Sequence, residues 1–247
     1  MNKISVVIIS YNEERCISNA IESVLDLCKE IILIDSGSTD ATLEIAMQYE
    51  LVKIRKSAFE NYANQRNKGI EAASCPWILM LDADEVVSAE LANHIRTTVL
   101  ESGVSYQVKR RNYIWGKWLD NATGKDFQVR IFENHVNLRY HRPVHEQLSG
   151  LTRLVRLKGH LSHYPKISTT EIIEKQNKYT SLECESKDFK NTSYFVLFFK
   201  PFYTFISILL IKGAWRDGLR GLCWSFIVLT YEIFKSIKII EKRNNWK

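Results

Sequence analysis

The first half of the chain alternates short apolar runs with longer segments of mixed polarity. Three runs rich in β-branched residues occupy positions 4–9 (ISVVII), 30–35 (EIILID) and 77–82 (WILMLD). The segments between them have the length and the spacing of apolar residues that are typical of helices. Strands that are apolar on both faces and alternate with helices indicate βαβ units. The pattern therefore predicts an α/β fold with a predominantly parallel central sheet.

Polar residues follow each of these three runs directly. The runs lead into SYNEE, DSGSTD and DADE, respectively. In an open α/β sheet, ligands bind in the crevice beyond the carboxyl ends of the strands. The three polar segments are therefore expected to meet at one site.

The pattern changes near residue 104, where shorter strand-like runs separated by turns begin. Residues 166–192 then read as a polar helix with Ser168 or Thr169 at its start. We expect one domain over residues 1–165, in two halves divided at 103/104, and a helical extension over residues 166–247.

Two apolar stretches, 195–211 and 221–234, lie within this extension. Lys200 and Pro201 interrupt the first, and neither stretch reaches the ~20 uninterrupted apolar residues that a spanning helix needs. A helical apolar stripe is formed by Leu222, Phe226, Leu229, Ile233, Ile237 and Ile240. Amphipathic helices at a membrane surface are the first interpretation; packing on the domain or a dimer interface is the alternative.

The charge distribution supports the membrane interpretation. The formal net charge is +6, and residues 187–247 carry 11 Lys and Arg against 4 Asp and Glu. The basic residues thus flank the apolar stretches, whereas a nucleic-acid-binding protein carries them as a patch on its folded domain. We expect an anionic membrane surface as a partner and no nucleic acid.

The cysteines and the start of the chain indicate the compartment. Five scattered cysteines without a CxxC pair suggest reduced thiols and a cytosolic protein. The apolar run at the start, MNKISVVIIS, is too short for a signal peptide and reads as a buried strand. The expected location is the cytoplasm, at the inner face of the cytoplasmic membrane.

Asp82 and Asp84 are the strongest candidates for chemistry. One residue separates them, so both carboxylates point to the same side of an extended strand end. Two like charges this close need a neutralising cation or solvation by water. Mg²⁺ or Mn²⁺ is suitable, since hard divalent cations bind carboxylates and phosphates. A solvated turn that caps a helix is the alternative.

The ordered set SYNEE, DSGSTD, QRN and DADE resembles the family 2 glycosyltransferases, which have the GT-A fold and use nucleotide-diphosphate sugars. The resemblance implies that Asp35 accepts a hydrogen bond from uracil, that Asp82 faces the ribose, and that Asp84 binds the metal. Gly37 allows a tight turn. The remaining residues implied to hold the nucleotide are Ser10, Tyr11, Asn12, Glu13 and Arg66.

The likeness extends to the lipopolysaccharide-core glucosyltransferase branch of the family. LMLDADE, RNYIWGKWL, VRIF, PVHE, LSHY and KGAWRDGLRGL follow one another over nearly the whole chain. This implies inverting transfer of a sugar, commonly glucose from UDP-glucose, to a lipopolysaccharide core or a related lipid-anchored glycan. Residues 1–103 would then bind the donor and residues 104–165 the acceptor.

The same resemblance suggests further site residues, each with a structural alternative. Glu146 in PVHE is the first candidate for the general base and Asp126 the second; a solvated loop acid is the alternative for Glu146. His163 would complete the metal shell or contact the diphosphate, unless it is structural. Trp115 and Trp118 would stack on acceptor sugars, unless they form an aromatic lid on the sheet.

Other functions fit the sequence less well. In a haloacid-dehalogenase-type phosphatase, the DxD motif would close the first strand, whereas here it closes the third. A dinucleotide-binding oxidoreductase needs a GxGxxG motif, which is absent. A polyprenyl-phosphate sugar synthase of the same fold and a non-catalytic sugar- or nucleotide-binding module remain the alternatives.

Overall fold

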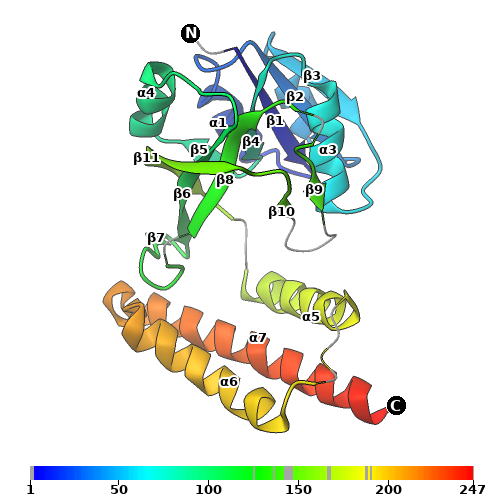
Figure 1. Ribbon diagram of the computed structural model, residues 1–247, viewed down its shortest axis with the longest axis vertical. Coiled ribbons are helices and arrows are strands. Elements are labelled where there is room, and N and C mark those ends of the chain that lie inside the picture. The colour runs from blue at the N-terminus through cyan, green and yellow to red at the C-terminus, as the bar shows by residue number, and fades with distance from the viewer. Residues whose placement is uncertain are drawn as a thin grey trace. The chain divides into compact units, whose positions relative to one another are not determined.

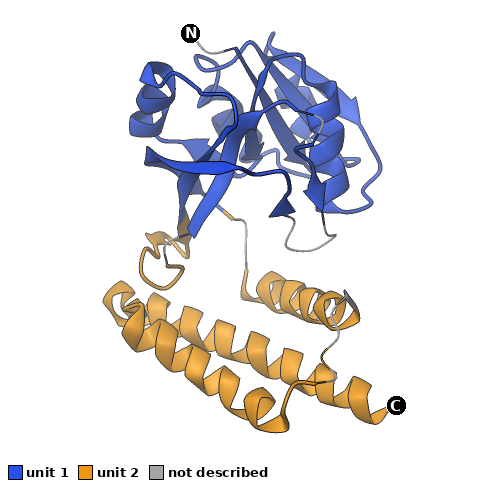
Figure 2. Ribbon diagram, viewed as in Figure 1, with its two compact units in different colours: residues 1–111, 126–164 blue, residues 112–125, 165–247 orange. Residues whose placement is uncertain are grey.

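The computed structural model describes residues 3–124, 126–135, 137–141, 147–165, 168–186, 189 and 191–246. These residues form two compact units (Figure 2). Unit 1 comprises residues 1–111 and 126–164, and unit 2 comprises residues 112–125 and 165–247.

Unit 1 is the α/β part of the chain (Figure 1). Its helices are α1 (Ile17–Glu22), α2 (Thr42–Ala46), α3 (Tyr62–Ala72) and α4 (Ala89–Thr97). Its strands are β1 (Ile4–Ser10), β2 (Glu30–Asp35), β3 (Val52–Lys56), β4 (Trp77–Asp82), β5 (Glu85–Val87), most of β6 (Val104–Ile114), β8 (Asp126–Glu133), β9 (Tyr140–His141), β10 (Gln147–Leu148) and β11 (Arg153–His163).

The three predicted strands form the centre of the sheet. Its order is β3-β2-β1-β4-β8-β6-β11-β5, and β1 pairs in parallel with both β2 and β4. The alternating residues of β1 contribute to two cores, since Val6 and Ile8 pack on one face of the sheet and Val7 on the other. Burial of both faces explains the continuous apolar runs. The predicted α/β fold is confirmed.

Helices cover both faces of this parallel part. Buried residues of α1, α2 and α4 join the first core, whereas Ala63 and Ile70 of α3 join the second. Gly69 allows α3 to lie close to the sheet, because a Cβ at this position would overlap the buried Val7 side chain. The close packing of α3 fixes the position of its polar residues near the carboxyl ends of the strands.

Antiparallel strands extend the sheet beyond β4. Strand β8 pairs with β4, and β11 pairs with β5 so that His163 lies opposite Glu85. This register brings a residue from position 163 to the end of the DADE segment. The antiparallel part thus returns distant residues to the edge where β1, β2 and β4 end.

Unit 2 contains the end of β6, strand β7 (Lys117–Trp118) and the helices of the second half of the chain. Its helices are α5 (Thr169–Ser186), α6 (Tyr194–Ile206), a π-helical continuation (Ser207–Ile211), a 3₁₀ turn (Ala214–Asp217) and α7 (Leu219–Asn244). Ser168 and Glu171 form a reciprocal capping box at the start of α5, close to the predicted helix start. Helix α6 continues through Lys200 and Pro201, although the sequence suggested a break there.

Residues 112–125 belong to unit 2, although the chain on both sides of them belongs to unit 1. Asp217 holds this segment by accepting hydrogen bonds from the backbone N–H groups of Asn121 and Ala122, at 3.0 and 2.7 Å. An apolar cluster that includes Ile114, Leu119 and Ile208 joins it to the helices. The sequence placed this segment with residues 104–165, so the division of the structure differs from the predicted one here.

Candidate active site at the strand ends

Asp35, at the end of β2, organises the turn that follows it. Its Oδ2 accepts hydrogen bonds from the backbone N–H groups of Gly37 and Ser38, both at 2.9 Å. Its Oδ1 accepts from the hydroxyls of Ser38 and Ser10, at 2.5 and 3.1 Å. Gly37 has a φ of +95°, which glycine adopts without strain. Asp35 is thus fixed by the turn, and its contact with a nucleobase stays a prediction.

The segment after β1 is tied to the same turn. The backbone N–H of Asn12 donates to Ser38 Oγ at 2.9 Å, and Asn12 Oδ1 accepts from the backbone N–H of Thr39 at 2.8 Å. The backbone N–H of Glu13 donates to Thr42 Oγ1 at 2.7 Å. Tyr11 remains 59% exposed. The structure therefore joins the predicted residues 10–13 and 35–37 in one rigid rim, with an aromatic ring at its surface.

Asp82, the first carboxylate of the DxD motif, lies between two arginines. Arg66 Nη2 is 2.7 Å from Asp82 Oδ1, and Arg130 Nη2 is 3.1 Å from Asp82 Oδ2. Burial acts to raise the pKa of Asp82, but the charges of Arg66 and Arg130 outweigh it and lower the pKa below its ordinary value. Asp82 is therefore a fixed anion at the end of β4.

Glu85 completes this buried cluster. It is fully buried, its Oε1 lies 2.5 Å from Arg130 Nη2, and its Oε2 accepts from the backbone N–H of Asp82 at 3.1 Å. The sequence assigned no part to Glu85 or Arg130. A charged residue within the apolar run VRIF was a usable signal, because a buried arginine is rarely unpaired.

The buried cluster predicts a large effect on stability. Arg130→Met is expected to lower the free energy of unfolding by about 3–5 kcal/mol, because it leaves the fully buried Glu85 without its main charged partner. Urea denaturation of both proteins measures the change.

Arg153→Met is the matched control. Arg153 pairs with Glu101 at 3.3 Å, but the two side chains are 66% and 64% exposed. An exposed pair contributes about 1 kcal/mol or less. Equal destabilisation by the two substitutions would contradict the assignment of a buried cluster.

Asp84 and His163, the two predicted metal ligands, lie together. His163 Nε2 is 3.2 Å from Asp84 Oδ2, although the residues are distant in the sequence. The pairing of β5 with β11 causes this approach, and the backbone N–H of Tyr164 donates to the carbonyl oxygen of Asp84 at 2.9 Å. Asp82 and Asp84 thus have different partners, which explains how two nearby carboxylates are tolerated.

Asp84 and His163 provide one oxygen and one nitrogen donor. Within the described part of the chain, no three His, Cys, Asp or Glu side chains group closely enough to hold an ion. Two protein ligands nevertheless fit a divalent cation that completes its coordination with substrate phosphates and water. The donor set therefore fits a metal bound together with a diphosphate.

Of the two candidate bases, the structure describes Asp126 and not Glu146. Asp126 begins β8, where it accepts hydrogen bonds from Arg110 Nε at 2.8 Å and Gln128 Nε2 at 2.6 Å. Arg110 Nη1 also lies 3.8 Å from Glu85 Oε1, which connects Asp126 to the buried cluster. Glu146 lies outside the described residues. The choice between the two stays a prediction.

Trp115 and Trp118 belong to unit 2, whereas the other described residues of the candidate site belong to unit 1. The ring of Trp115 is 6.3 Å from that of Trp224, and its carbonyl oxygen accepts from Arg220 Nε at 2.7 Å. Trp118 makes an edge-to-face contact with Tyr113 at 5.0 Å. These contacts give both indoles a packing function, while their binding of acceptor sugars stays a prediction.

Comparison with known proteins identifies the family. The sequence profile described as "Glycosyl transferase family 2" matches residues 5–147, which is more than half of the chain. The protein named "Lipopolysaccharide core biosynthesis glycosyltransferase LpsC" of Rhizobium meliloti is 28% identical, over 97% of this chain and 92% of its own length. An uncharacterised glycosyltransferase of Rickettsia typhi is 26% identical, over 98% and 88%.

A solved structure of S. aureus TarS, residues 1–349, in complex with UDP is 14% identical, covers 98% of this chain and 92% of its own, and superposes with a TM-score of 0.49. Neither the sequence identity nor the TM-score of this match supports an argument about ligands. The family profile spans the rim formed by residues 10–13 and 35–37, the DxD motif and the cluster around Asp82. The chain therefore belongs to glycosyl transferase family 2 and is a transferase of the α/β GT-A type, as the resemblance implied.

Proposed function

We propose that this protein is an inverting glycosyltransferase that transfers glucose from UDP-glucose to a lipopolysaccharide core or a related lipid-anchored glycan. The observation that carries the proposal is the approach of Asp84 to His163, beside the fixed anion Asp82, at the end of β4. This edge of the sheet combines a candidate metal site with the rim formed after β1 and β2. The family supports transferase chemistry, and the similarity to LpsC supports the acceptor class.

The rim is suited to a nucleoside. Asp35 holds the following turn by accepting hydrogen bonds from the backbone N–H groups of Gly37 and Ser38. Asn12 fixes the segment after β1 to the same turn. A rigid rim lowers the conformational entropy lost on binding. The exposed ring of Tyr11 offers an apolar surface for the base, while Asp82 at the next strand end faces the ribose.

Asp84 and His163 would hold Mg²⁺ or Mn²⁺ together with the diphosphate of the donor. When bound, the metal supplies positive charge that stabilises the departing diphosphate. Asp82 is not needed as a ligand, because Arg66 and Arg130 already neutralise it. These arginines fix Asp82 before the donor binds, so little reorganisation is needed during the reaction.

A carboxylate must also remove the proton of the acceptor hydroxyl as it attacks the anomeric carbon. Glu146 is the proposed base, and Asp126 is the alternative. Attack from the face opposite the leaving diphosphate inverts the anomeric configuration. The reaction forms one glycosidic bond, breaks the sugar–phosphate bond and releases UDP with the proton on the base.

The donor is the first part of the proposal to test. Purified protein with Mn²⁺ should release the nucleoside diphosphate from UDP-glucose faster than from UDP-galactose, UDP-N-acetylglucosamine or GDP-mannose, as measured by chromatography of the free UDP or GDP. Equal rates with all four donors, or no turnover of any, would overturn the assignment.

The acceptor is tested separately with the preferred donor. Truncated lipopolysaccharide should gain one sugar, detected by mass spectrometry, with the anomeric configuration inverted in the product by NMR. Transfer to polyprenyl phosphate and not to lipopolysaccharide would indicate a sugar synthase of the same fold. Binding of UDP without transfer to either acceptor would indicate a non-catalytic module.

A further inference from the structure

Helix α6 and its continuation present an unusually apolar surface. Residues Tyr194–Ile211 form one helix of 18 residues that is apolar enough to cross a membrane, yet only 17% of its residues are buried. We define the α6 face as the exposed residues Phe195, Phe198, Phe199, Phe202, Ile206 and Leu210. A contiguous apolar surface of this kind marks a contact with a partner or a membrane.

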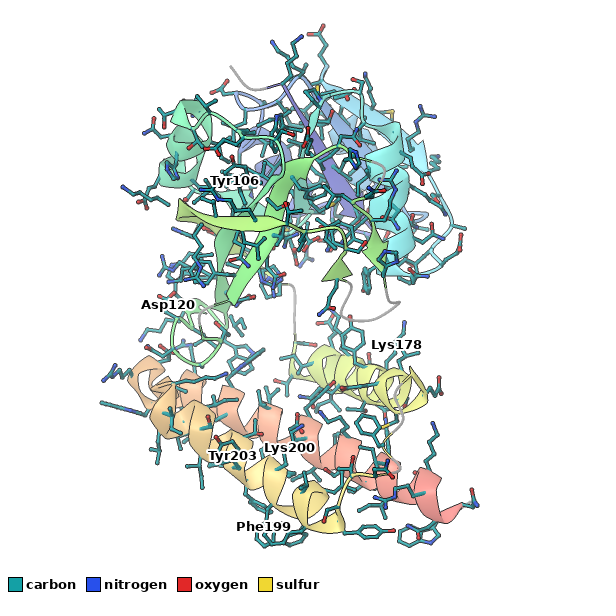
Figure 3. The ribbon with its side chains drawn as sticks, viewed as in Figure 1. Tyr106, Asp120, Lys178, Phe199, Lys200 and Tyr203 are labelled. Atoms are coloured by element: carbon teal, nitrogen blue, oxygen red, sulfur yellow. The ribbon has the colours of Figure 1, made fainter. Side chains whose placement is uncertain are left out.

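The one charged side chain within this apolar stretch is paired with α7. Lys200 is the only charged residue between positions 194 and 211, and its Nζ lies 3.3 Å from Glu232 Oε2 on α7. Figure 3 shows Lys200 on the side of α6 towards α7, while Phe199 lies on the outer side. Large apolar residues of α6 are exposed, while Glu232 and Lys235 of α7 are buried, which is the reverse of the arrangement in a water-soluble helical bundle.

Charged residues of α7 and α5 form a connected set with Lys200. Lys235 Nζ lies 2.8 Å from Glu232 Oε1 and 3.7 Å from Glu183 Oε2, and the hydroxyl of Tyr231 donates to Glu183 at 3.0 Å. Lys235 and Glu232 are both buried. Lys200, which is 49% exposed, thus joins this set through Glu232.

Helix α5 gives unit 2 a polar side. It packs on α7, where Gln176 Nε2 donates to the carbonyl oxygen of Ile227 at 2.6 Å and Lys238 Nζ donates to that of Asn177 at 2.7 Å. Helix α7 thus lies between α5 and α6 (Figure 1). The outer surface of α5 exposes Glu171, Glu174, Lys175 and Lys178. Unit 2 thus has a polar surface on α5 and an apolar surface on α6, with α7 between them.

Cations and amphipathic aromatic rings stand at both ends of the α6 face. The guanidinium carbon of Arg243 is 4.5 Å from the ring centroid of Tyr194 at one end, and that of Arg216 is 5.2 Å from the Trp215 ring at the other. Lys212 adds an exposed cation at the second end. Arginine, lysine, tyrosine and tryptophan are the residues that favour the headgroup region of a bilayer.

We propose that the α6 face lies in the plane of an anionic bilayer, at the boundary of headgroups and acyl chains, with α5 towards the water. A spanning orientation would bring the charged surface of α5 into hydrocarbon. Insertion of the α6–α7 turn alone would bury Lys212, Arg216 and Arg220. Only the in-plane orientation buries apolar residues and leaves these cations at the anionic headgroups.

A second copy of the chain fits the face less well. Both ends of the face are basic, so two copies that meet through it bring like charges together whether their helices run parallel or antiparallel. Like charges across an interface are unfavourable. The inference concerns unit 2 alone and does not depend on the proposed reaction.

Vesicle binding tests the proposal. The full chain should bind vesicles of phosphatidylcholine and anionic phosphatidylglycerol more tightly than phosphatidylcholine alone, and salt should weaken the binding. Phe198→Asp should weaken it about tenfold or more, since a phenylalanine side chain leaves the acyl boundary and a charge replaces it. Phe198 is 65% exposed, so unit 2 should still fold, as checked by circular dichroism.

Ile173→Asp is the matched control, because Ile173 is an exposed apolar residue on the opposite helix α5. It should leave vesicle binding unchanged. Equal loss by the two variants, or unchanged binding by Phe198→Asp, overturns the proposal. So does a wild-type dimer in lipid-free solution that Phe198→Asp converts to a monomer without loss of vesicle binding.

The orientation is tested with one cysteine added at either end of the helix, its labelling distinguished from that of the native cysteines by peptide mapping. In Asn191→Cys and Lys212→Cys, a membrane-impermeant thiol reagent added outside the vesicles should modify both positions, as quantified by mass spectrometry. Modification at one end and protection at the other would indicate a spanning helix and overturn the in-plane assignment.

Discussion

Asp84→Ala is expected to abolish sugar transfer and leave the fold intact. The side chain of Asp84 contacts His163, while its link to Tyr164 runs through the backbone and survives the substitution. The variant would lose the carboxylate proposed to hold the metal and, with it, charge stabilisation of the departing diphosphate. Transfer from UDP-glucose, measured with and without added Mn²⁺, shows the loss.

Asp26→Ala, which removes an exposed carboxylate that precedes the amino end of β2, is the control and should keep its activity. Far-UV circular dichroism and urea denaturation show that both variants are folded. Addition of excess EDTA to the native protein should reproduce the defect of Asp84→Ala. Full activity in EDTA would mean that the reaction needs no metal at Asp84.

Glu146→Gln is expected to reduce the transfer rate by about 10²–10⁴-fold, which is the usual cost of losing a positioned general base. The amide retains the size of the carboxyl group but does not accept the proton at neutral pH. Binding of UDP should change little, because the base acts on the acceptor. Single-turnover kinetics and UDP titration separate the two effects.

Asp126→Asn provides the comparison. Asp126 already accepts hydrogen bonds from Arg110 and Gln128, so its substitution should disturb their positions more than the proton transfer. A wild-type rate for Glu146→Gln together with collapse of Asp126→Asn would transfer the assignment to Asp126. Rescue of the failing variant at high pH would support a direct function in proton removal.

The local pattern of the sequence predicted the parallel centre of the sheet because β1, β2 and β4 are buried on both faces. Their apolar runs and polar ends are visible without knowledge of strand pairing. Short helices were harder to bound, since α1 and α2 cover only Ile17–Glu22 and Thr42–Ala46 of the longer segments that suggested them. Strand β3, with its exposed charged residues, gave too weak an apolar signal to be recognised.

Pairings between distant residues explain the features that the sequence did not predict. Arg130 reaches Asp82 because β8 pairs with β4, and no local pattern reports that register. Lys200 appeared to interrupt an apolar stretch, but Glu232 on α7 pairs with it and the helix continues. Resemblance to a family assigned Asp84 and His163 to one site, and the structure brings them together, whereas it did not point to Arg130.

The assignment of residues 112–125 to unit 2 limits how the two units can be separated. Ile114 and Leu119 are buried in a cluster that includes Ile208 and Ala214. Deleting everything after residue 165 would strip this cluster of its helical half and leave its apolar side chains in water, where they favour aggregation. Exchange of the helices between related enzymes therefore requires residues 112–125 to be exchanged with them, because the helices and this loop share one apolar core.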